Sequence, residues 1–214
     1  MEETDVNIQK AINIIRKRPG MYIGSEKITP LWHFLDGCQF ILRLQDSHIK
    51  DILPLNFRYF NEYICARIGI CNNAGWCHNI LNICNGDEKE ALRRFFELYD
   101  DFNDVKINYF EWAVLSKYNI DCNNNMEKSC RMSYKTTGLW EKQPRYINPV
   151  SAYIIKLSIP AFLVAVETED NIECDSRLYK SSEIAKETLS SSFGDISSWN
   201  TYYDTPDFKD KDIV

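Results

Sequence analysis

The stretch DEKEALRRFFELYDDF, residues 87–102, gives the clearest indication of the fold. Asp87 and Glu90 form an Asp-x-x-Glu variant of the capping box, which predicts that a helix begins here. The apolar residues that follow recur at helical spacing, so one face of this helix is expected in a core. That face comprises Ala91, Phe95, Leu98 and Phe102.

Four more helices are expected before this stretch, over residues 5–17, 29–42, 56–68 and 74–85. The first ends because Arg18 precedes a proline, and Pro19 with Gly20 fits the central positions of a type II turn. Thr29 then resembles an N-cap, followed by Pro30 as the first helical residue. One apolar face is expected on this second helix: Leu31, Phe34, Leu35, Cys38 and Leu42.

The two remaining helices before residue 87 also carry recognisable end signals. Asn56 is a candidate N-cap for the third helix, and Gly86 is expected to close the fourth. The first hundred residues are therefore predicted to be helical.

The second half of the chain has a different pattern. Residues 152–159, 162–168 and 176–181 are rich in β-branched and apolar residues and predict a short antiparallel sheet, with a helix over 182–192. We expect a long loop or boundary at 119–138 and an acidic, mobile end over 195–214. The predicted fold class is α+β, with a helical region 1–104 packed on an α+β region 105–214 as one compact unit.

The charge balance argues against some classes of partner. The formal net charge is −6, which disfavours direct nucleic-acid binding. No apolar run reaches the length of a membrane span, and the first residues do not form a signal peptide. We therefore expect a cytoplasmic protein, monomeric and without membrane association, whose partner is a basic protein.

The cysteines do not form a recognisable metal site. The spacing is six or seven residues between successive members of the set Cys65, Cys71, Cys77 and Cys84. This set therefore lacks the CxxC pair that is typical of zinc coordination. We expect apolar core thiols and no metal or cofactor. Cys77 beside His78 leaves open a cysteine-dependent activity, although adjacent side chains on a helix point about 100° apart.

The string RKRPGMYIGS, residues 16–25, resembles the opening of the ATPase domain of type II topoisomerase subunits. ATP hydrolysis in that family needs a general-base Glu, a magnesium-binding Asn and glycine-rich phosphate loops. The following segment, LWHFLDGCQFIL, offers only Asp36 as an acid and no Asn. ATPase activity is not expected, although a degenerate nucleotide binder stays open.

A second resemblance covers more of the chain, roughly residues 15–104. The order RPGMYIG, then LWHFLDGCQFIL, then a Gly-Trp pair and the acidic helix 87–102 is similar to immunity proteins of contact-dependent growth inhibition and related toxin systems. The resemblance implies a protein without catalytic activity that binds the C-terminal domain of a cognate secreted toxin and occludes it. A generic adaptor for another basic protein is the remaining alternative.

Negative charge is concentrated in two segments that would attract a basic toxin, such as a nuclease. Residues 87–104 hold seven acids against three bases, and residues 195–214 hold five acids against two. Two tryptophans in polar surroundings are further candidate anchors. The candidate toxin-binding residues are Glu97, Asp100, Asp101, Asp104, Trp140, Trp199, Asp204 and Asp207.

Overall fold

The computed structural model describes residues 8–44, 53–69, 74–115, 130–134, 140–144, 146, 148–169 and 172–203. Its internal contacts divide the chain into two compact units, with the division between Val105 and Lys106. The first unit is helical and the second contains the sheet, which confirms the α+β fold class. The packing of the two regions as one compact unit stays a prediction.

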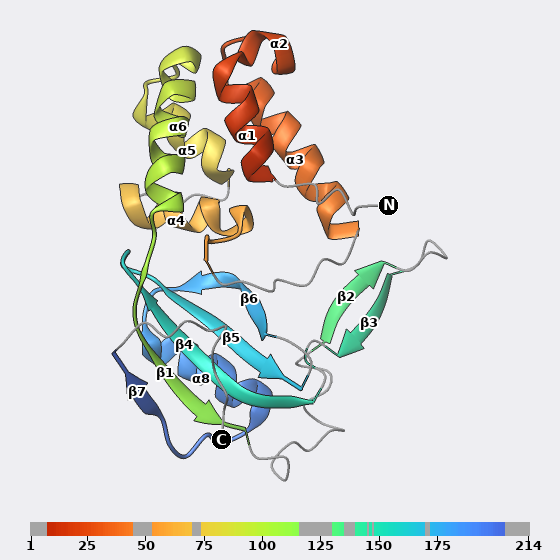
Figure 1. The fold of residues 1–214 in the computed structure, drawn as a ribbon, viewed down its shortest axis with the longest axis vertical. Coiled ribbons are helices and arrows are strands. Elements are labelled where there is room, and N and C mark those ends of the chain that lie inside the picture. Colours follow the sequence, from red (N-terminus) through yellow and green to blue (C-terminus); the bar gives the residue numbers. More distant parts are fainter. Residues whose placement is uncertain are drawn as a thin grey trace. The chain divides into compact units, whose positions relative to one another are not determined.

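Helices make up the described part of the first unit. In Figure 1, α1 and α3 run side by side and α2 joins them at one end. The elements are α1 (Ile8–Lys17), α2 (Pro19–Ile23), α3 (Ile28–Leu44), η1 (Phe57–Tyr59), α4 (Phe60–Ile68), α5 (Gly75–Ile83) and α6 (Glu88–Asn103).

The break between α1 and α2 lies where the sequence predicts it. Arg18 has φ −151° and ψ 69°, outside the α region. The predicted type II turn is wrong, because Pro19 and Gly20 begin α2 and Gly20 lacks the positive φ that such a turn requires. Pro19 suits the first helical position, where an N–H has no helical partner. Gly24, with φ 73°, ends α2 in the left-handed conformation.

The start of α3 is capped by another helix. α3 begins at Ile28, so the prediction of Thr29 as N-cap is wrong. The backbone N–H and the hydroxyl of Thr29 donate to the Glu88 carboxylate on α6, at 3.1 and 2.7 Å. Partial burial acts to raise the pKa of Glu88, but the hydrogen bonds from Thr29 outweigh it and lower this pKa. Glu88 thus stabilises a free amide at the start of α3.

Replacing Glu88 by glutamine should lower the free energy of unfolding by about 1–2 kcal/mol at pH 7, because hydrogen bonds to a charged group are lost. The pKa of Glu88 is lowered in the folded protein. Its stabilisation is therefore present above the unfolded-state pKa of about 4.3 and is lost as the pH falls through the lower folded-state pKa. Urea unfolding of both proteins at pH 7 and pH 3 measures the difference.

The matched control for this prediction is Glu90→Gln, two residues along α6. The Glu90 carboxylate forms an exposed ion pair with Arg93, and exposed pairs contribute little. This variant should change stability much less than Glu88→Gln. Two outcomes would contradict the assigned role of Glu88: a Glu88→Gln protein as stable as wild type at pH 7, or a difference that persists unchanged at pH 3.

The buried face of α3 differs from the predicted one. Leu31 and Leu35 are buried and Cys38 is half-buried, as predicted, but Phe34 is 40% exposed. Ile28 is buried at the start of the helix, so the buried stripe is narrower than the sequence pattern indicates. The side chain of Leu42 lies outside the described residues.

Two predicted end signals between α3 and α6 are confirmed. The Asn56 side chain accepts a hydrogen bond from the Arg58 N–H at 3.0 Å and begins η1, which continues into α4. Gly86, with φ 81°, donates its N–H to the Leu81 carbonyl at 2.9 Å and ends the turn after α5. These local interactions fix where the helices start and stop.

The capping box of α6 is half confirmed. Asp87 is the N-cap, and its side chain accepts from the N–H groups of Lys89 and Glu90, both at 3.0 Å. The reciprocal half is wrong, because the Asp87 N–H donates to the Cys84 carbonyl and Glu90 pairs with Arg93. The whole predicted stripe of α6 is buried, and Leu92 and Tyr99 are buried beside it.

The core of the first unit is a cluster of aromatic rings centred on Phe60. Its ring centroid lies 5.0–6.1 Å from those of six other rings. Edge-to-face and offset contacts at these distances add stability beyond area burial. The six rings are Phe57, Tyr63, Trp76, Phe95, Tyr99 and Phe102.

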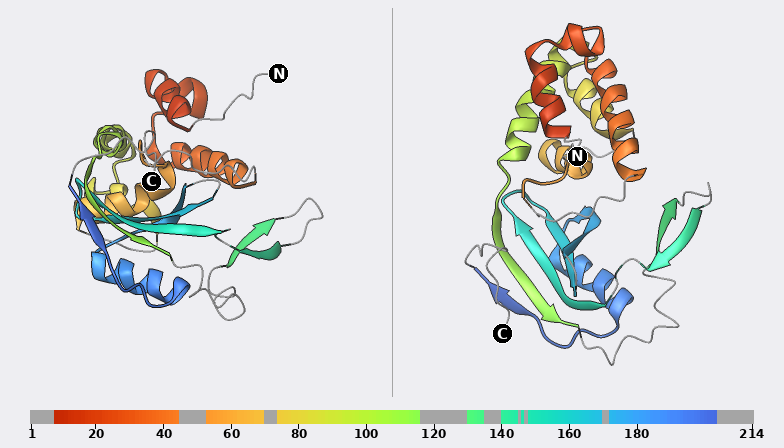
Figure 2. Two further views of the ribbon diagram at one scale, coloured as in Figure 1. Left: turned by 60° about the horizontal axis from the view of Figure 1, so that its bottom comes forward. Right: turned by 45° about the vertical axis from the view of Figure 1, so that its right-hand side comes forward.

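The second unit contains a five-stranded antiparallel sheet in the order β6-β5-β4-β1-β7, with a separate two-stranded sheet, β2-β3. Figure 2 shows α8 on one face of the larger sheet. The elements are β1 (Ile107–Val114), β2 (Cys130–Tyr134), β3 (Trp140–Pro144), β4 (Pro149–Leu157), β5 (Phe162–Thr168), β6 (Ile172–Tyr179), α8 (Ser182–Phe193) and β7 (Asn200–Tyr202).

The face of the sheet under α8 forms a second core. α8 begins at the predicted place, with the Ser181 side chain accepting from the Ile184 N–H at 3.3 Å. Apolar residues of β4, β5 and α8 then pack together across this face. The buried cluster comprises Leu115, Ala152, Ile154, Val164, Val166, Tyr179, Ala185, Leu189 and Phe193.

Two predictions for the second half are wrong in part. The predicted loop 119–138 contains β2, which pairs with β3. The predicted mobile end 195–214 contains β7, which pairs with β1 through Phe110–Trp112. Residues 204–214 lie outside the described residues.

Candidate protein-binding site

The acidic candidates on α6 lie off its buried face. Glu97, Asp100 and Asp101 have side chains that are 43%, 57% and 57% exposed. Asp104 is also exposed, and its N–H donates to the Asp100 carbonyl at the end of the helix. The sequence therefore predicts correctly which face of α6 carries these acids.

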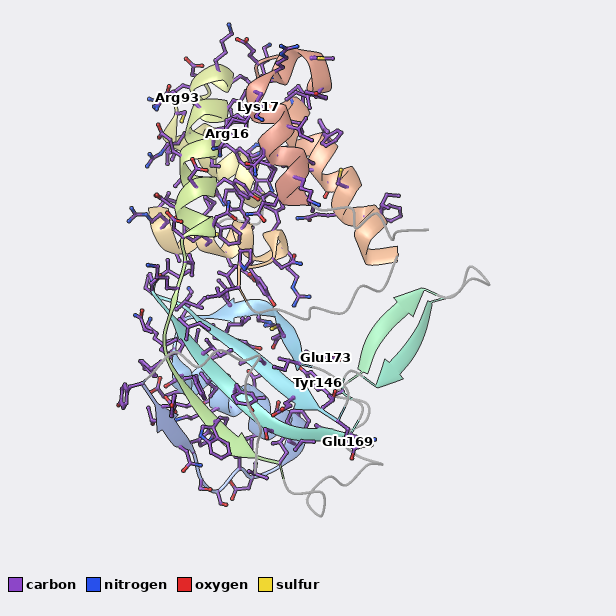
Figure 3. The ribbon with its side chains drawn as sticks, in the orientation of Figure 1. Arg16, Lys17, Arg93, Tyr146, Glu169 and Glu173 are labelled. Carbon is purple, nitrogen blue, oxygen red and sulfur yellow. The ribbon has the colours of Figure 1, made fainter. Side chains whose placement is uncertain are left out.

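Arginines within the first unit occupy most of this acidic face. Glu97 pairs with Arg93 and with Arg94. Asp100 accepts two hydrogen bonds from Arg16 of α1, at 2.7 and 3.1 Å. Figure 3 labels Arg16 on α1 and Arg93 on α6.

Asp101 has a looser partner, since the Arg67 guanidinium of α4 lies 3.9 Å from its carboxylate. The acids of α6 are thus largely compensated by bases that are distant in sequence or on the same helix. A basic partner would have to compete with these internal pairs, so the net charge of residues 87–104 overstates their attraction for it.

Among the candidates in the second unit, the structure describes the side chain of Trp199 alone. Trp199 does not lie in polar surroundings. It is half-buried against the cluster under α8, and the Lys186 ammonium lies 5.5 Å from its ring centroid. Trp140 lies in β3, but its side chain falls outside the described residues, as do Asp204 and Asp207.

A surface that the sequence analysis missed lies on α1 and α2. We call it the α1–α2 surface and define it by Ile14, Lys17, Arg18, Met21 and Tyr22. α2 contains no buried residue, and Met21 is 70% exposed. Ile14 and Tyr22 are 47% and 48% exposed, and Lys17 and Arg18 are exposed as well.

One signal in the sequence could have located this surface. Residues 8–23 hold four bases and no acid, although the whole chain has a net charge of −6. Arg16 turns toward α6, where it also donates to the Phe96 carbonyl at 3.2 Å and stacks over the Phe96 ring. Lys17 and Arg18 form no ion pair within the described residues.

The structure does not support a cysteine-dependent activity at Cys77. Its side chain is buried, and burial raises the pKa of the thiol to about 11, with the Glu88 carboxylate acting in the same direction. A reactive cysteine needs a lowered pKa and access to solvent. The thiol of Cys77 is therefore protonated at neutral pH, while His78 is exposed.

A small cavity lies at the end of α8 in the second unit. Its volume is about 60 Å³, and Leu115, Phe193, Asp195 and Ser197 are among its lining residues. Pockets for organic ligands are usually some 300–1,000 Å³, so this cavity is sized for water molecules. Among the described residues, no group of three or more His, Cys, Asp or Glu side chains is arranged to hold a metal ion.

Comparisons with known proteins identify no relative of this chain. No family model matches the chain, no curated protein matches it, and no solved structure does. None of the helices in the described ranges is both long and apolar enough to cross a bilayer.

Proposed function

We propose that this chain is an immunity protein, which binds a cognate secreted toxin domain in the cytoplasm and neutralises it by occlusion, without catalysis or a cofactor. The observation that carries the proposal is the position of the RPGMYIG string, which resembles a string of that family. Its central part forms α2, a short helix with defined ends and no buried side chain. A helix whose side chains are all exposed or half-buried is well placed to contact another protein.

The net charge bears on which toxin is expected. A net charge of −6 attracts a basic protein at long range and raises the rate of encounter. A nuclease toxin, whose surface is built to hold phosphate, is the partner we favour. In this account, the net charge of the whole chain guides the encounter, and the internally paired acids of α6 contribute little to direct contacts.

Growth of bacteria that express the toxin tests this proposal. The C-terminal domain encoded immediately upstream of this gene should arrest growth when expressed alone, and co-expression of this chain should restore growth. A chain with Phe60→Ala, chosen to disrupt the core, is the control, and it tests whether expressing a second protein is enough to restore growth. An upstream domain that is harmless, or that remains toxic when the intact chain is present, would contradict the proposal.

A further inference from the structure

The α1–α2 surface combines exposed apolar side chains with two bases, Lys17 and Arg18, that form no ion pair within the described residues. Ile14 comes from the exposed face of α1, and Met21 and Tyr22 come from α2. Lys17 and Arg18 lie between them in the chain, and Figure 3 labels Lys17 beside Arg16. The chain offers no acid to balance this charge from residue 8 to residue 23.

The helix dipole of α1 explains only some of the bases and exposed apolar residues on the α1–α2 surface. Lys17 lies at the C-terminus of α1, where a positive charge complements the helix dipole. The dipole does not account for the exposure of Met21 or for a second base at Arg18, which lies outside both helices. Burial of a methionine side chain is stabilising, and Met21, which is 70% exposed, gains little of this stabilisation in the free protein.

The backbone of α2 is held in a defined shape. Pro19 restricts the first helical position, and Gly24 ends the helix with a positive φ. The Met21 N–H donates to the Arg18 carbonyl at 3.1 Å. The exposed side chains thus project from an ordered element, which lowers the entropic cost of binding.

We propose that the α1–α2 surface binds an acidic segment of the toxin, with carboxylates placed against Lys17 and Arg18 and an apolar side chain placed against Met21. This inference rests on the proposed function, because the partner is the toxin that the chain neutralises. Methionine suits such a contact because its flexible side chain adapts to the shape of its partner.

A protein segment fits this surface better than an anionic membrane does. Membrane adsorption needs a broad apolar face, and the defined surface offers three apolar side chains on two short helices. The net charge of −6 also repels an anionic bilayer as a whole. A docked peptide lies within the screening length of about 8 Å, so the two local bases dominate its attraction.

Charge reversal separates docking at this surface from long-range attraction. The variant Lys17→Glu/Arg18→Glu makes the chain four charges more negative. If only the net charge attracted a basic toxin, this change would speed association and leave dissociation unchanged. If Lys17 and Arg18 contact acids of the toxin, dissociation speeds up, because local contacts act mainly on the dissociation rate.

The test is surface-bound kinetics with the toxin domain at two salt concentrations. We expect Lys17→Glu/Arg18→Glu to raise the dissociation rate constant at least about tenfold, equivalent to about 1.4 kcal/mol. Met21→Ala should raise it about fivefold without any change in charge. The control Lys106→Glu/Lys180→Glu makes the same charge change at exposed lysines of the second unit and should stay within about twofold of wild type.

The outcomes distinguish this inference from the proposed function. If the wild-type chain neutralises the toxin but both α1–α2 variants dissociate as slowly as the lysine control, the inference is wrong and the function stands. If the wild-type chain neither binds nor neutralises the toxin, the function itself fails. Sedimentation with phosphatidylcholine–phosphatidylglycerol vesicles that depends on Lys17 and Arg18 would assign the surface to a membrane and overturn the inference.

Discussion

Replacing Phe60 by alanine should lower the free energy of unfolding of the first unit by about 3–5 kcal/mol. Phe60 is fully buried, and its ring contacts six other aromatic rings from η1, α4, α5 and α6. The substitution removes the ring from the centre of this cluster and leaves a cavity that the surrounding rings cannot fill without moving. This loss approaches the whole stability of a small domain.

Near-ultraviolet circular dichroism during urea unfolding measures this effect, because Trp76 lies in the cluster. Phe40→Ala on α3 is the matched control, since Phe40 is 58% exposed. It should change stability by about 0.5 kcal/mol or less. A Phe60→Ala protein within about 1 kcal/mol of wild type would mean that the aromatic cluster is not the core of this unit.

Replacing Ile154 by alanine should destabilise the second unit by about 2–4 kcal/mol. Ile154 is fully buried in β4, which pairs with β1 on one side and β5 on the other. Its side chain belongs to the cluster that α8 covers, together with Leu189 and Phe193. Losing it opens a void between the sheet and the helix, and far-ultraviolet circular dichroism during urea unfolding reports the change.

The matched control on the sheet is Val114→Ala in β1, where the side chain is 65% exposed. It should leave stability within about 0.5 kcal/mol of wild type. Equal losses for Ile154→Ala and Val114→Ala would contradict the packing of α8 on this face, because burial would then make no difference.

Local signals predicted the helical unit well. Asn56, Gly86 and Asp87 each act within a few residues, and their hydrogen bonds lie where the sequence places them. The type II turn at Pro19 was wrong because a proline and a glycine also suit the first positions of a short helix. The N-cap at Thr29 was wrong because its partner, Glu88, lies 59 residues away.

Three strands of the larger sheet lie near predicted ranges, and the predicted strand 176–181 overlaps the end of β6. β4 and β5 lie close to the predicted ranges because their central residues are buried almost without interruption. β1 carries a mixed pattern of buried and exposed residues, and all three residues of β7 are exposed. Such strands are fixed by pairing with distant segments, which periodicity does not reveal.

Contacts between distant segments also limit what the sequence predicts about the candidate site. The exposure of Glu97, Asp100 and Asp101 follows from the helical period of α6. The partner of Asp100 does not, because Arg16 reaches it across 84 residues of sequence. Glu97, in contrast, pairs with Arg93 and Arg94 at the i,i+4 and i,i+3 spacing of the same helix. The sequence does not reveal the α1–α2 surface, because Pro19 and Gly20 predict a turn where the structure has the exposed helix α2.

The most direct test of the central claim is a titration of toxin activity with the purified chain. Occlusion without catalysis predicts that activity falls in proportion to the chain added and vanishes near one equivalent, with intact toxin recovered after denaturing separation. Loss of activity at a small fraction of an equivalent, or covalent change of the toxin, would show that the chain acts as an enzyme. Toxin that stays active within the saturated complex would contradict occlusion itself.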